Sequence, residues 1–263
     1  MRRLRALLMA ALALLATGCA TVAPAGLDAP GVVAASPLDP WERWNRKVFA
    51  FNETLDKAVF TPVAQTYRDV VPGLVRTGVN NVFGNVNDAW SATNHLLQGK
   101  VQISLEMGMR VLTNTFFGLG GLLDPATEMK LERRSEDFGQ TLGRWGIPSG
   151  PFLMLPLFGP STVRDGAGFV LDRQASATRF VDTRVARYSL TWLEFVGVRT
   201  SLLETTTLID QVALDKYSFI RDAYLSRRRD ALFDGAPPMD TFEDEPADAP
   251  PTSAPGPPAK PAP

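Results

Sequence analysis

The residues that could do chemistry in this sequence are few, and the histidine content limits them first. His95 is the only histidine among the 263 residues, so a Ser-His-Asp triad, a Cys-His pair or a multi-histidine metal site would have to include it. Its surroundings, SATNHLLQG, match no nucleophile elbow. The acidic side chains are scattered, and nothing singles out two of them as general acid and base; they include Asp124, Glu136, Asp137, Asp165 and Asp172. We therefore predict no catalytic site, metal or other cofactor, and a protein that is not an enzyme.

Two amide side chains lie on one flank of the first predicted helix. Asn45 and Asn52 are seven residues apart, which is about two helical turns, and Phe51 lies beside Asn52. Buried amides need hydrogen-bond partners. These residues therefore either tie helices together or line a polar interior, and the sequence leaves both interpretations open.

Glycines recur at intervals of three or four in the segment EDFGQTLGRWGIPSGP. They are Gly139, Gly143, Gly146 and Gly150, and Asp137 precedes them. The glycines either allow helices to pack closely or allow a hairpin to move, because glycine accepts backbone angles that other residues avoid. We take these five residues as candidates for a hinge.

A charge-free stretch, GPFLMLPLFGPS at 150–161, needs cover from water. Its large apolar residues are Phe152, Leu153, Met154, Leu155, Leu157 and Phe158, and its three prolines exclude a helix. Burying six such side chains is worth about 9 to 18 kcal/mol. Either a protein core or lipid must cover them, and we take Phe152, Leu153, Leu155, Leu157 and Phe158 as candidates for a membrane-facing shell.

The elements that must position these residues have a helical period. Apolar residues at spacings of three and four run through 41–58, 75–97 and 101–116, and further helices are expected near 189–212 and 215–235. No convincing alternation of period two is visible. The sequence therefore predicts an all-α fold for residues 39–235.

The apolar faces of these helices are wider than a small bundle needs. The segment 111–123 has no charge, and a helix that is apolar over most of its circumference is deeply buried or contacts lipid. No segment is long and apolar enough to be a conventional spanning helix. Irregular backbone at membrane depth needs protein or a water-filled cavity to satisfy its polar groups. These constraints predict an amphipathic helical ring with lipid outside and a cavity inside.

The ends of the chain have their own signals. Residues 1–18 combine a basic start with a short apolar run, which is typical of a signal peptide. Cys19, the only cysteine, follows Ala-Thr-Gly as in a bacterial lipobox, and we expect it to be acylated. Residues 19–38 would then be a tether and residues 236–263, rich in proline and acid, a disordered tail. The segment between signal and tail has equal numbers of basic and acidic residues, which excludes the basic surface of a nucleic-acid-binding protein.

Seven motifs, in this order, resemble those of the MlaA family of outer-membrane lipoproteins, also called VacJ. They are DPWERWNRKVFAFNETLD, PVAQTYRDVVP, LLQGK, LTNTFFGLGGLLDPA, EDFGQTLGRWGIPSGPF, LPLFGPSTVRDGAG and RDAYLSRRRD. The resemblance covers nearly everything from Asp39 to about Asp234, whereas the proline-rich tail is not part of the family pattern.

The resemblance implies a donut-shaped helical protein in the periplasmic leaflet of the outer membrane of a diderm bacterium. Such a protein would remove misplaced phospholipids from the outer leaflet through an amphipathic channel and so maintain lipid asymmetry. Its partners would be a trimeric porin and a periplasmic phospholipid carrier similar to MlaC. By the same resemblance Asn45, Phe51 and Asn52 would shape the channel, and Asp137, Gly139, Gly143 and Gly146 would belong to the hairpin motif.

Two other classes of function stay open at this point. A lipase acting on the same lipids would depend on His95 as its only possible catalytic histidine. A structural lipoprotein that braces porins or envelope assembly would share the anchor and the apolar shell without moving lipid.

Overall fold

The computed structural model describes residues 38–238. The predicted signal peptide, Cys19, nearly all of the tether and the tail from residue 239 lie outside the described residues. The elements, in order, are α2 (Glu42–Leu55), η2 (Asp56–Phe60), α3 (Thr61–Val70), α4 (Gly73–Leu97), α5 (Val101–Phe116), α6 (Pro125–Glu128), α7 (Phe138–Arg144), β1 (Phe152–Leu155), β2 (Gly159–Thr162), α8 (Val163–Ala175), η3 (Ala177–Phe180), α9 (Arg184–Ser201), α10 (Leu203–Val212) and α11 (Lys216–Leu232). The predicted helical fold class is confirmed.

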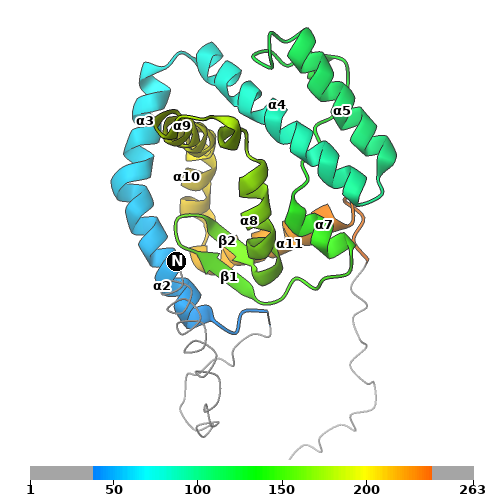
Figure 1. Cartoon of the computed structure of the whole chain (residues 1–263). Helices are drawn as coiled ribbons and strands as arrows, with labels where there is room; N and C mark the ends of the chain where they lie inside the picture. The colour runs from blue at the N-terminus through cyan, green and yellow to red at the C-terminus, as the bar shows by residue number, and fades with distance from the viewer. Residues whose placement is uncertain (1–37, 239–263) are drawn as a thin grey trace, which may run out of the picture. The chain divides into compact units, whose positions relative to one another are not determined.

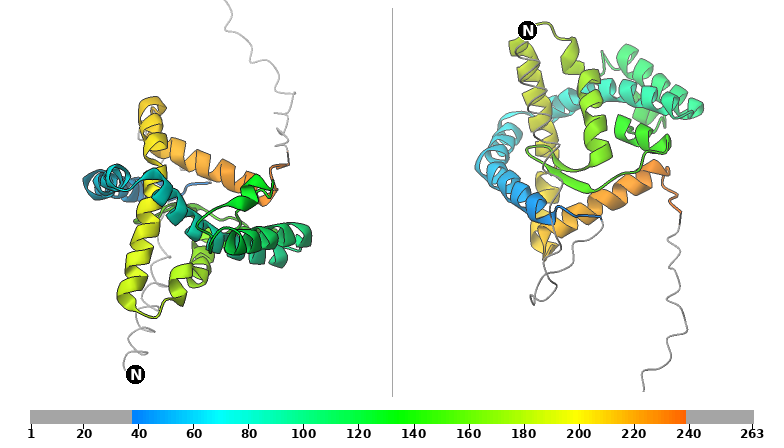
Figure 2. Two further views of the ribbon diagram at one scale, coloured as in Figure 1. Left: turned by 90° about the horizontal axis from the view of Figure 1, so that it is seen from above. Right: turned by 60° about the horizontal axis from the view of Figure 1, so that its bottom comes forward.

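Within residues 38–238, the helices follow one another around the β1–β2 hairpin and α8. Figure 1 shows α2, η2 and α3 as one nearly continuous rod on one side, followed by α4, which leads across to α5. Along the way α4 packs on α5, α3 packs on α9, and α7 packs on α8. Figure 2 shows α11 running from the end of α10 to α7, and it contacts β2 on its way.

The β1–β2 hairpin corrects the expectation that the chain shows no strand-like pattern. Its two strands are antiparallel, with Phe152 opposite Thr162 and Leu155 opposite Gly159. Alternate residues of β1 are buried and half-buried, as in a strand with one covered face. The alternation was hidden because all four β1 residues are apolar, so the sequence shows no contrast between the two faces.

The interior is unusually polar. The hydrophobic core consists of Val48, Phe152, Met154 and Tyr217, whereas most other fully buried residues of the described part are polar or charged. Large hydrophobic residues are instead numerous at the surface. A water-soluble protein normally buries its large apolar residues and rarely exposes large apolar patches.

Within the part of the chain that the structure describes, no helix has both the length and the apolar character needed to cross a membrane.

Candidate functional site

The helix α5 turns its polar side inward and its apolar side outward. The predicted apolar stripe of this helix is more than half exposed in the structure; it comprises Val101, Leu105, Met109, Leu112 and Phe116. The buried positions are Met107, Arg110, Thr113 and Asn114. The helical periodicity was therefore predicted correctly, and the exposed stripe agrees with the prediction that lipid lies outside.

Arg110 holds the polar interface of α4, α5 and α6 together. Its Nε donates to Asp88 Oδ2 at 2.9 Å, and its Nη2 pairs with Asp124. Its Nη1 donates to the Leu131 carbonyl at 2.6 Å and to Thr127 Oγ1 at 3.0 Å. A buried guanidinium is stable only when it is paired and hydrogen-bonded in this way. The sequence does not predict this cluster, although Asp88 is the only aspartate, glutamate, lysine or arginine in the second half of α4.

Asn45 joins α2 to β1. Its side chain is fully buried, and its Nδ2 donates to Asp39 Oδ1 at 2.8 Å and to the Phe152 carbonyl at 3.1 Å. Its Oδ1 accepts from Met154 N at 2.9 Å. The amide therefore takes the place of a neighbouring strand at the free edge of β1, which favours the tying interpretation for this residue.

Asn52 repeats the arrangement two turns later. Its Nδ2 donates to the Leu155 carbonyl at 2.9 Å and its Oδ1 accepts from Leu157 N at 2.8 Å. The seven-residue spacing thus places both amides against one strand edge. Phe51 lies apart from this edge and is more than half exposed.

The five residues of the predicted membrane-facing shell differ in their exposure. Phe152 is fully buried against Tyr217 and Tyr224, so its assignment to the shell is corrected: it belongs to the core because it lies on the covered face of β1. Leu153 and Leu155 are half-buried on the other face. Leu157 and Phe158, in the turn between the strands, are exposed.

The predicted glycine hinge contains a helix and a loop in place of a simple hairpin. Gly139 lies in α7, where its backbone approaches Gly168 of α8 so closely that a Cβ on Gly168 would lie 2.5 Å from Gly139 N. Gly143 is equally crowded by Arg164. These two positions follow the close-packing interpretation.

Gly146 and Gly150, by contrast, follow the helix and have positive φ angles of 91° and 68°, which glycine adopts without strain. Of the four glycines in the predicted hinge, only Gly146 and Gly150 therefore use the backbone freedom that glycine provides. Whether the segment moves stays a prediction.

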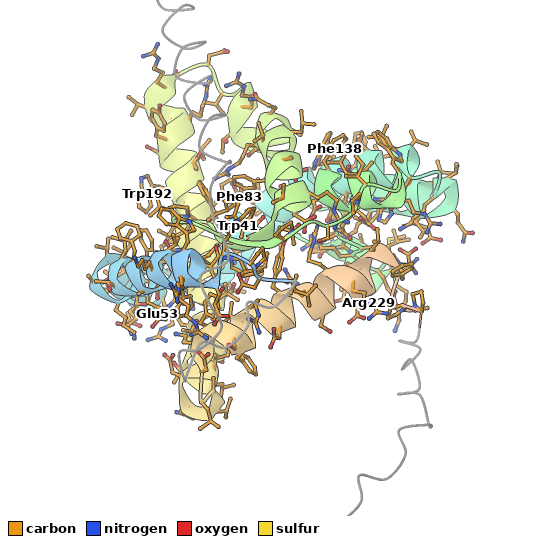
Figure 3. The ribbon with its side chains drawn as sticks, turned by 90° about the horizontal axis from the view of Figure 1, so that it is seen from below. Trp41, Glu53, Phe83, Phe138, Trp192 and Arg229 are labelled. Atoms are coloured by element: carbon orange, nitrogen blue, oxygen red, sulfur yellow. The ribbon has the colours of Figure 1, made fainter. Side chains whose placement is uncertain are left out.

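A cavity of about 600 Å³ lies between α7 with its following loop, α8 and α11. We call it the arginine cavity. Its walls include three of the predicted hinge glycines; the complete lining is Leu38, Gly143, Gly146, Ile147, Pro148, Ser149, Gly150, Arg164, Leu225, Ser226, Arg228, Arg229 and Leu232. Figure 3 shows Arg229 on α11, with Phe138 on the neighbouring α7. Cationic groups and apolar side chains therefore share one cavity.

Two aspartates hold two of the three arginines of this cavity, Arg164 and Arg228, in place. Arg228 donates from Nε to Asp165 Oδ2 at 2.9 Å and from Nη2 to Asp137 Oδ1 at 3.0 Å, and Arg164 donates from Nη2 to Asp165 Oδ1 at 2.9 Å. Burial raises the pKa of Asp165, but the hydrogen bond and charge of Arg228 outweigh it and leave that pKa below its usual value. Asp137 also caps α7 by accepting from Gln140 N. The predicted hinge residue Asp137 thus anchors the start of α7 to α11.

Asp172 ties three helices together close to this cavity. Its Oδ1 accepts from Trp90 Nε1 on α4 at 2.8 Å and from Phe138 N on α7 at 2.9 Å. Burial of the Asp172 carboxyl nevertheless raises its pKa.

A second hollow adjoins Asn52. Its volume is about 280 Å³, and most of its lining is apolar, including Phe49, Met154 and Ile220. One border is formed by ion pairs in which Arg199 Nε lies 2.6 Å from Asp56 Oδ1 and Lys216 pairs with Glu53. Asp56 begins the π-helical turn η2, a geometry that is frequent at functional sites.

His95 lies inside the protein. Its side chain is fully buried, its Nε2 lies 3.1 Å from the Arg134 carbonyl, and its Nδ1 lies 3.8 Å from Glu136 Oε1. Among residues 38–238, no three histidine, cysteine, aspartate or glutamate side chains are arranged to hold a metal ion.

The comparisons with known proteins agree with one another. Residues 37–231 match the family model for "MlaA lipoprotein". The "Intermembrane phospholipid transport system lipoprotein MlaA" of Shigella flexneri is 34% identical over 217 residues, which cover 81% of this chain and 82% of that protein. A protein of Rickettsia prowazekii is 36% identical over 137 residues, and the match spans about half the length of each chain, 52% and 55%.

The fold has a solved counterpart as well. A chain from the structure described as "Structural basis for maintenance of bacterial outer membrane lipid asymmetry" is 33% identical and superimposes with a TM-score of 0.65. The match covers 74% of this chain and 98% of the solved one.

Proposed function

Because the chain belongs to the MlaA lipoprotein family, we propose that it is a phospholipid-transport lipoprotein of the bacterial outer membrane. It removes phospholipids that are misplaced in the outer leaflet, passes them through an amphipathic passage and delivers them to a periplasmic carrier. The process maintains the lipid asymmetry of the membrane and breaks no covalent bond.

The observation that carries this proposal is the inverted packing of α5. A stripe of five large apolar residues faces outward while Arg110 and Asn114 face inward. In water, exposure of such a stripe would cost about 25 cal/mol per Å² of apolar surface. In a membrane leaflet the same stripe lies against hydrocarbon and needs no protein cover. Leu157 and Phe158, in the turn between β1 and β2, are exposed apolar residues as well.

The arginine cavity supplies the amphipathic wall that lipid transfer requires. A phospholipid headgroup loses water when it crosses an apolar layer, and an unpaired charge is expensive there. Arg164, Arg228 and Arg229 offer charged donors to the phosphate, while Leu225 and Leu232 accept the acyl chains. Because the passage offers cationic groups to the phosphate and apolar side chains to the acyl chains, it lowers the free-energy barrier to lipid movement. We place the hinge at Gly146 and Gly150, which border this cavity, and a second lipid-contacting wall at Asn52.

The remaining assignments complete the proposal. Acylated Cys19 anchors the chain in the periplasmic leaflet, residues 19–38 act as a tether, and residues 236–263 form a tail that follows the helical domain of residues 39–235. Stable anchoring at Cys19 requires two or more acyl chains on this residue, because a single chain gives only marginal membrane binding. The partners are a trimeric porin in the membrane and an MlaC-like carrier in the periplasm.

Deletion and complementation test the transport step. Deleting the gene is expected to raise outer-leaflet phospholipid, measured as increased palmitoylation of lipid A, and the intact chain restores the wild-type level. An unchanged palmitoylation level in the deletion strain would contradict transport.

Two other functions are separated by further measurements. A scaffold that only braces porins would not transfer labelled phospholipid from a membrane to a purified carrier. A lipase would need His95, but this ring is buried beside Glu136 and the Arg134 carbonyl, which supports a structural role. Retained function in His95→Gln, with the protein still folded, would exclude a histidine-dependent hydrolase.

A further inference from the structure

The arginine cavity has a charge composition that bears on which phospholipids it accepts. We propose, building on the transport function above, that it selects phospholipids whose headgroup has a net negative charge over zwitterionic phospholipids. The ligand chemistry is a phosphodiester with no attached ammonium group, joined to acyl chains.

The charged side chains of the wall are all cationic. Three arginines line the cavity, and none of its described lining residues is acidic. Asp137 and Asp165, which pair with Arg228 and Arg164, are not among the lining residues. A headgroup in the cavity therefore meets lining arginines, whereas the aspartates that pair with two of them are not part of the lining.

The same aspartates fix the direction of two of the guanidinium groups. Arg228 is held by Asp137 and Asp165 together, and Arg164 is held by Asp165. A guanidinium has five N–H donors in a rigid plane that matches the oxygens of a phosphate. Fixing this plane in advance lowers the entropy cost of binding. Arg229 is more exposed than the other two arginines, and its Nη2 donates to the Pro238 carbonyl at 2.6 Å.

The apolar lining indicates that the phosphate belongs to a lipid. Leu38, Ile147, Leu225 and Leu232 share the cavity with the arginines. Acyl chains would lie against these side chains, whereas a free phosphate ion would make no use of them. The cavity volume of about 600 Å³ accommodates a headgroup and the upper part of its chains, in the range typical of ligand pockets.

The described lining of the cavity has no carboxylate to pair with the ammonium group of a zwitterionic headgroup, and this absence favours anionic phospholipids. Phosphatidylglycerol and phosphatidylethanolamine both present a phosphate to the arginines. The ethanolamine ammonium, however, needs a carboxylate partner, and here it would lie near guanidinium groups of the same charge. Like-charge juxtaposition is a common way to reject a competing ligand.

Competition between two lipids measures this preference. The full-length protein, purified in a neutral detergent, is mixed with equal amounts of phosphatidylglycerol and phosphatidylethanolamine that have identical acyl chains. Bound lipid is counted by native mass spectrometry. We expect about five- to tenfold more phosphatidylglycerol, falling as salt is raised because exposed charges are screened. Equal occupancy by the two lipids at low salt would overturn the inference.

Arg229 is the residue to change, because it is more exposed than Arg164 and Arg228, which both bond to the buried Asp165. Arg229→Gln should reduce the preference at least threefold, and Arg229→Glu should bring it to one or reverse it. Arg227→Gln is the matched control, since Arg227 is an exposed arginine on the same helix that does not line the cavity. Circular dichroism checks that each variant is folded. An unchanged preference in folded Arg229→Glu, or an equal loss in Arg227→Gln, would contradict the assignment.

A competition experiment distinguishes a lipid ligand from a soluble anion, and the binding results distinguish failure of the selectivity from failure of the proposed function. Millimolar inorganic phosphate or glycerol phosphate should displace little phosphatidylglycerol; complete displacement would show a site for soluble anions and overturn the lipid assignment. Equal binding of both lipids refutes only the selectivity and leaves transport supported. Failure to bind or transfer either lipid would refute the proposed function itself.

Discussion

The hydrogen bonds of Asn45 permit a quantitative test of how α2 holds the hairpin. Replacing Asn45 by alanine removes two donated bonds, to Asp39 and to the Phe152 carbonyl, and one accepted bond, from Met154 N. Each buried partner left without a hydrogen bond costs about 1 to 3 kcal/mol. Asp39 retains its bond from Tyr217, so we count the two backbone groups in full. The expected loss is about 2 to 6 kcal/mol of unfolding free energy, a large part of the roughly 5 to 15 kcal/mol typical of a domain.

Thermal or urea unfolding in detergent, followed by tryptophan fluorescence, measures this loss. Asn52→Ala should cost less, about 1 to 2 kcal/mol, because Asn52 makes two bonds and is less buried. Gln102→Ala is the control, since Gln102 is exposed and bonds only to Glu106 in its own helix; it should change stability by less than about 0.5 kcal/mol. If Asn45→Ala were no worse than Gln102→Ala, the amide would not hold the hairpin, and the reasoning would fail.

Three other predictions concern the exposed stripe of α5, the contact of α7 with α8, and Asp165. Leu112→Glu, on the exposed stripe of α5, should reduce flotation with liposomes while helicity in detergent stays unchanged; undiminished flotation would argue against lipid contact. Gly168→Ala should destabilise by about 1 to 3 kcal/mol because its Cβ would meet the backbone of Gly139, whereas Gly108→Ala, with open space around it, should be neutral or slightly stabilising in the same unfolding assay. The folded-state pKa of Asp165 is lowered, so its contribution is present above its unfolded pKa of about 3.9 and is lost as pH falls through the folded value; acid unfolding below about pH 4 should therefore be less steep in Asp165→Asn than in the wild type.

The helical periodicity of the fold could be predicted because it depends on local spacing. The stripe from Val101 to Phe116 in α5 has the same periodicity whether water, protein or lipid lies beside it. The periodicity does not say whether this stripe faces the protein interior or the outside. Only the wide apolar faces of the helices and the charge-free segment 111–123 indicated that lipid lies beside the stripe. The structure places the stripe outward, which no count of apolar residues along one helix could establish.

The polar contacts were harder to predict because their partners are distant in the chain. Asp88 and Arg110 are 22 residues apart, and Asp137 and Arg228 are 91 apart. No local pattern pairs them, since each looks like an ordinary solvated charge in the sequence. Asn45 and Asn52 were found because two amides at a seven-residue spacing suggest one shared surface, although the strand edge they bind was not visible.

The roles of the four hinge glycines also could not be predicted from their spacing in the sequence. Gly139, Gly143, Gly146 and Gly150 have nearly equal spacing, yet the first two lie within a crowded helix and the last two have positive φ angles. Close packing and conformational freedom both select glycine. The helix end at Arg144 separates the two roles. Gly146 itself helps to end the helix, because its positive φ lets Ile147 N donate back to the Leu142 carbonyl at 3.0 Å.

The inverted packing and the polar interior have a common physical cause. When apolar side chains face hydrocarbon, bringing two helices together removes no apolar surface from water, so the hydrophobic effect contributes little to holding them. Hydrogen bonds and ion pairs between helices must then supply the specificity. The bonds of Arg110 between α4, α5 and α6 and those of Asn45 between α2 and β1 are the kind of contact that the proposed position in a lipid leaflet requires. The paired arginines at the cavity follow the same rule, because Asp137 and Asp165 stabilise charges that can also bind a phosphate. In this protein the groups that hold the fold and the groups proposed to bind the headgroup are parts of one network.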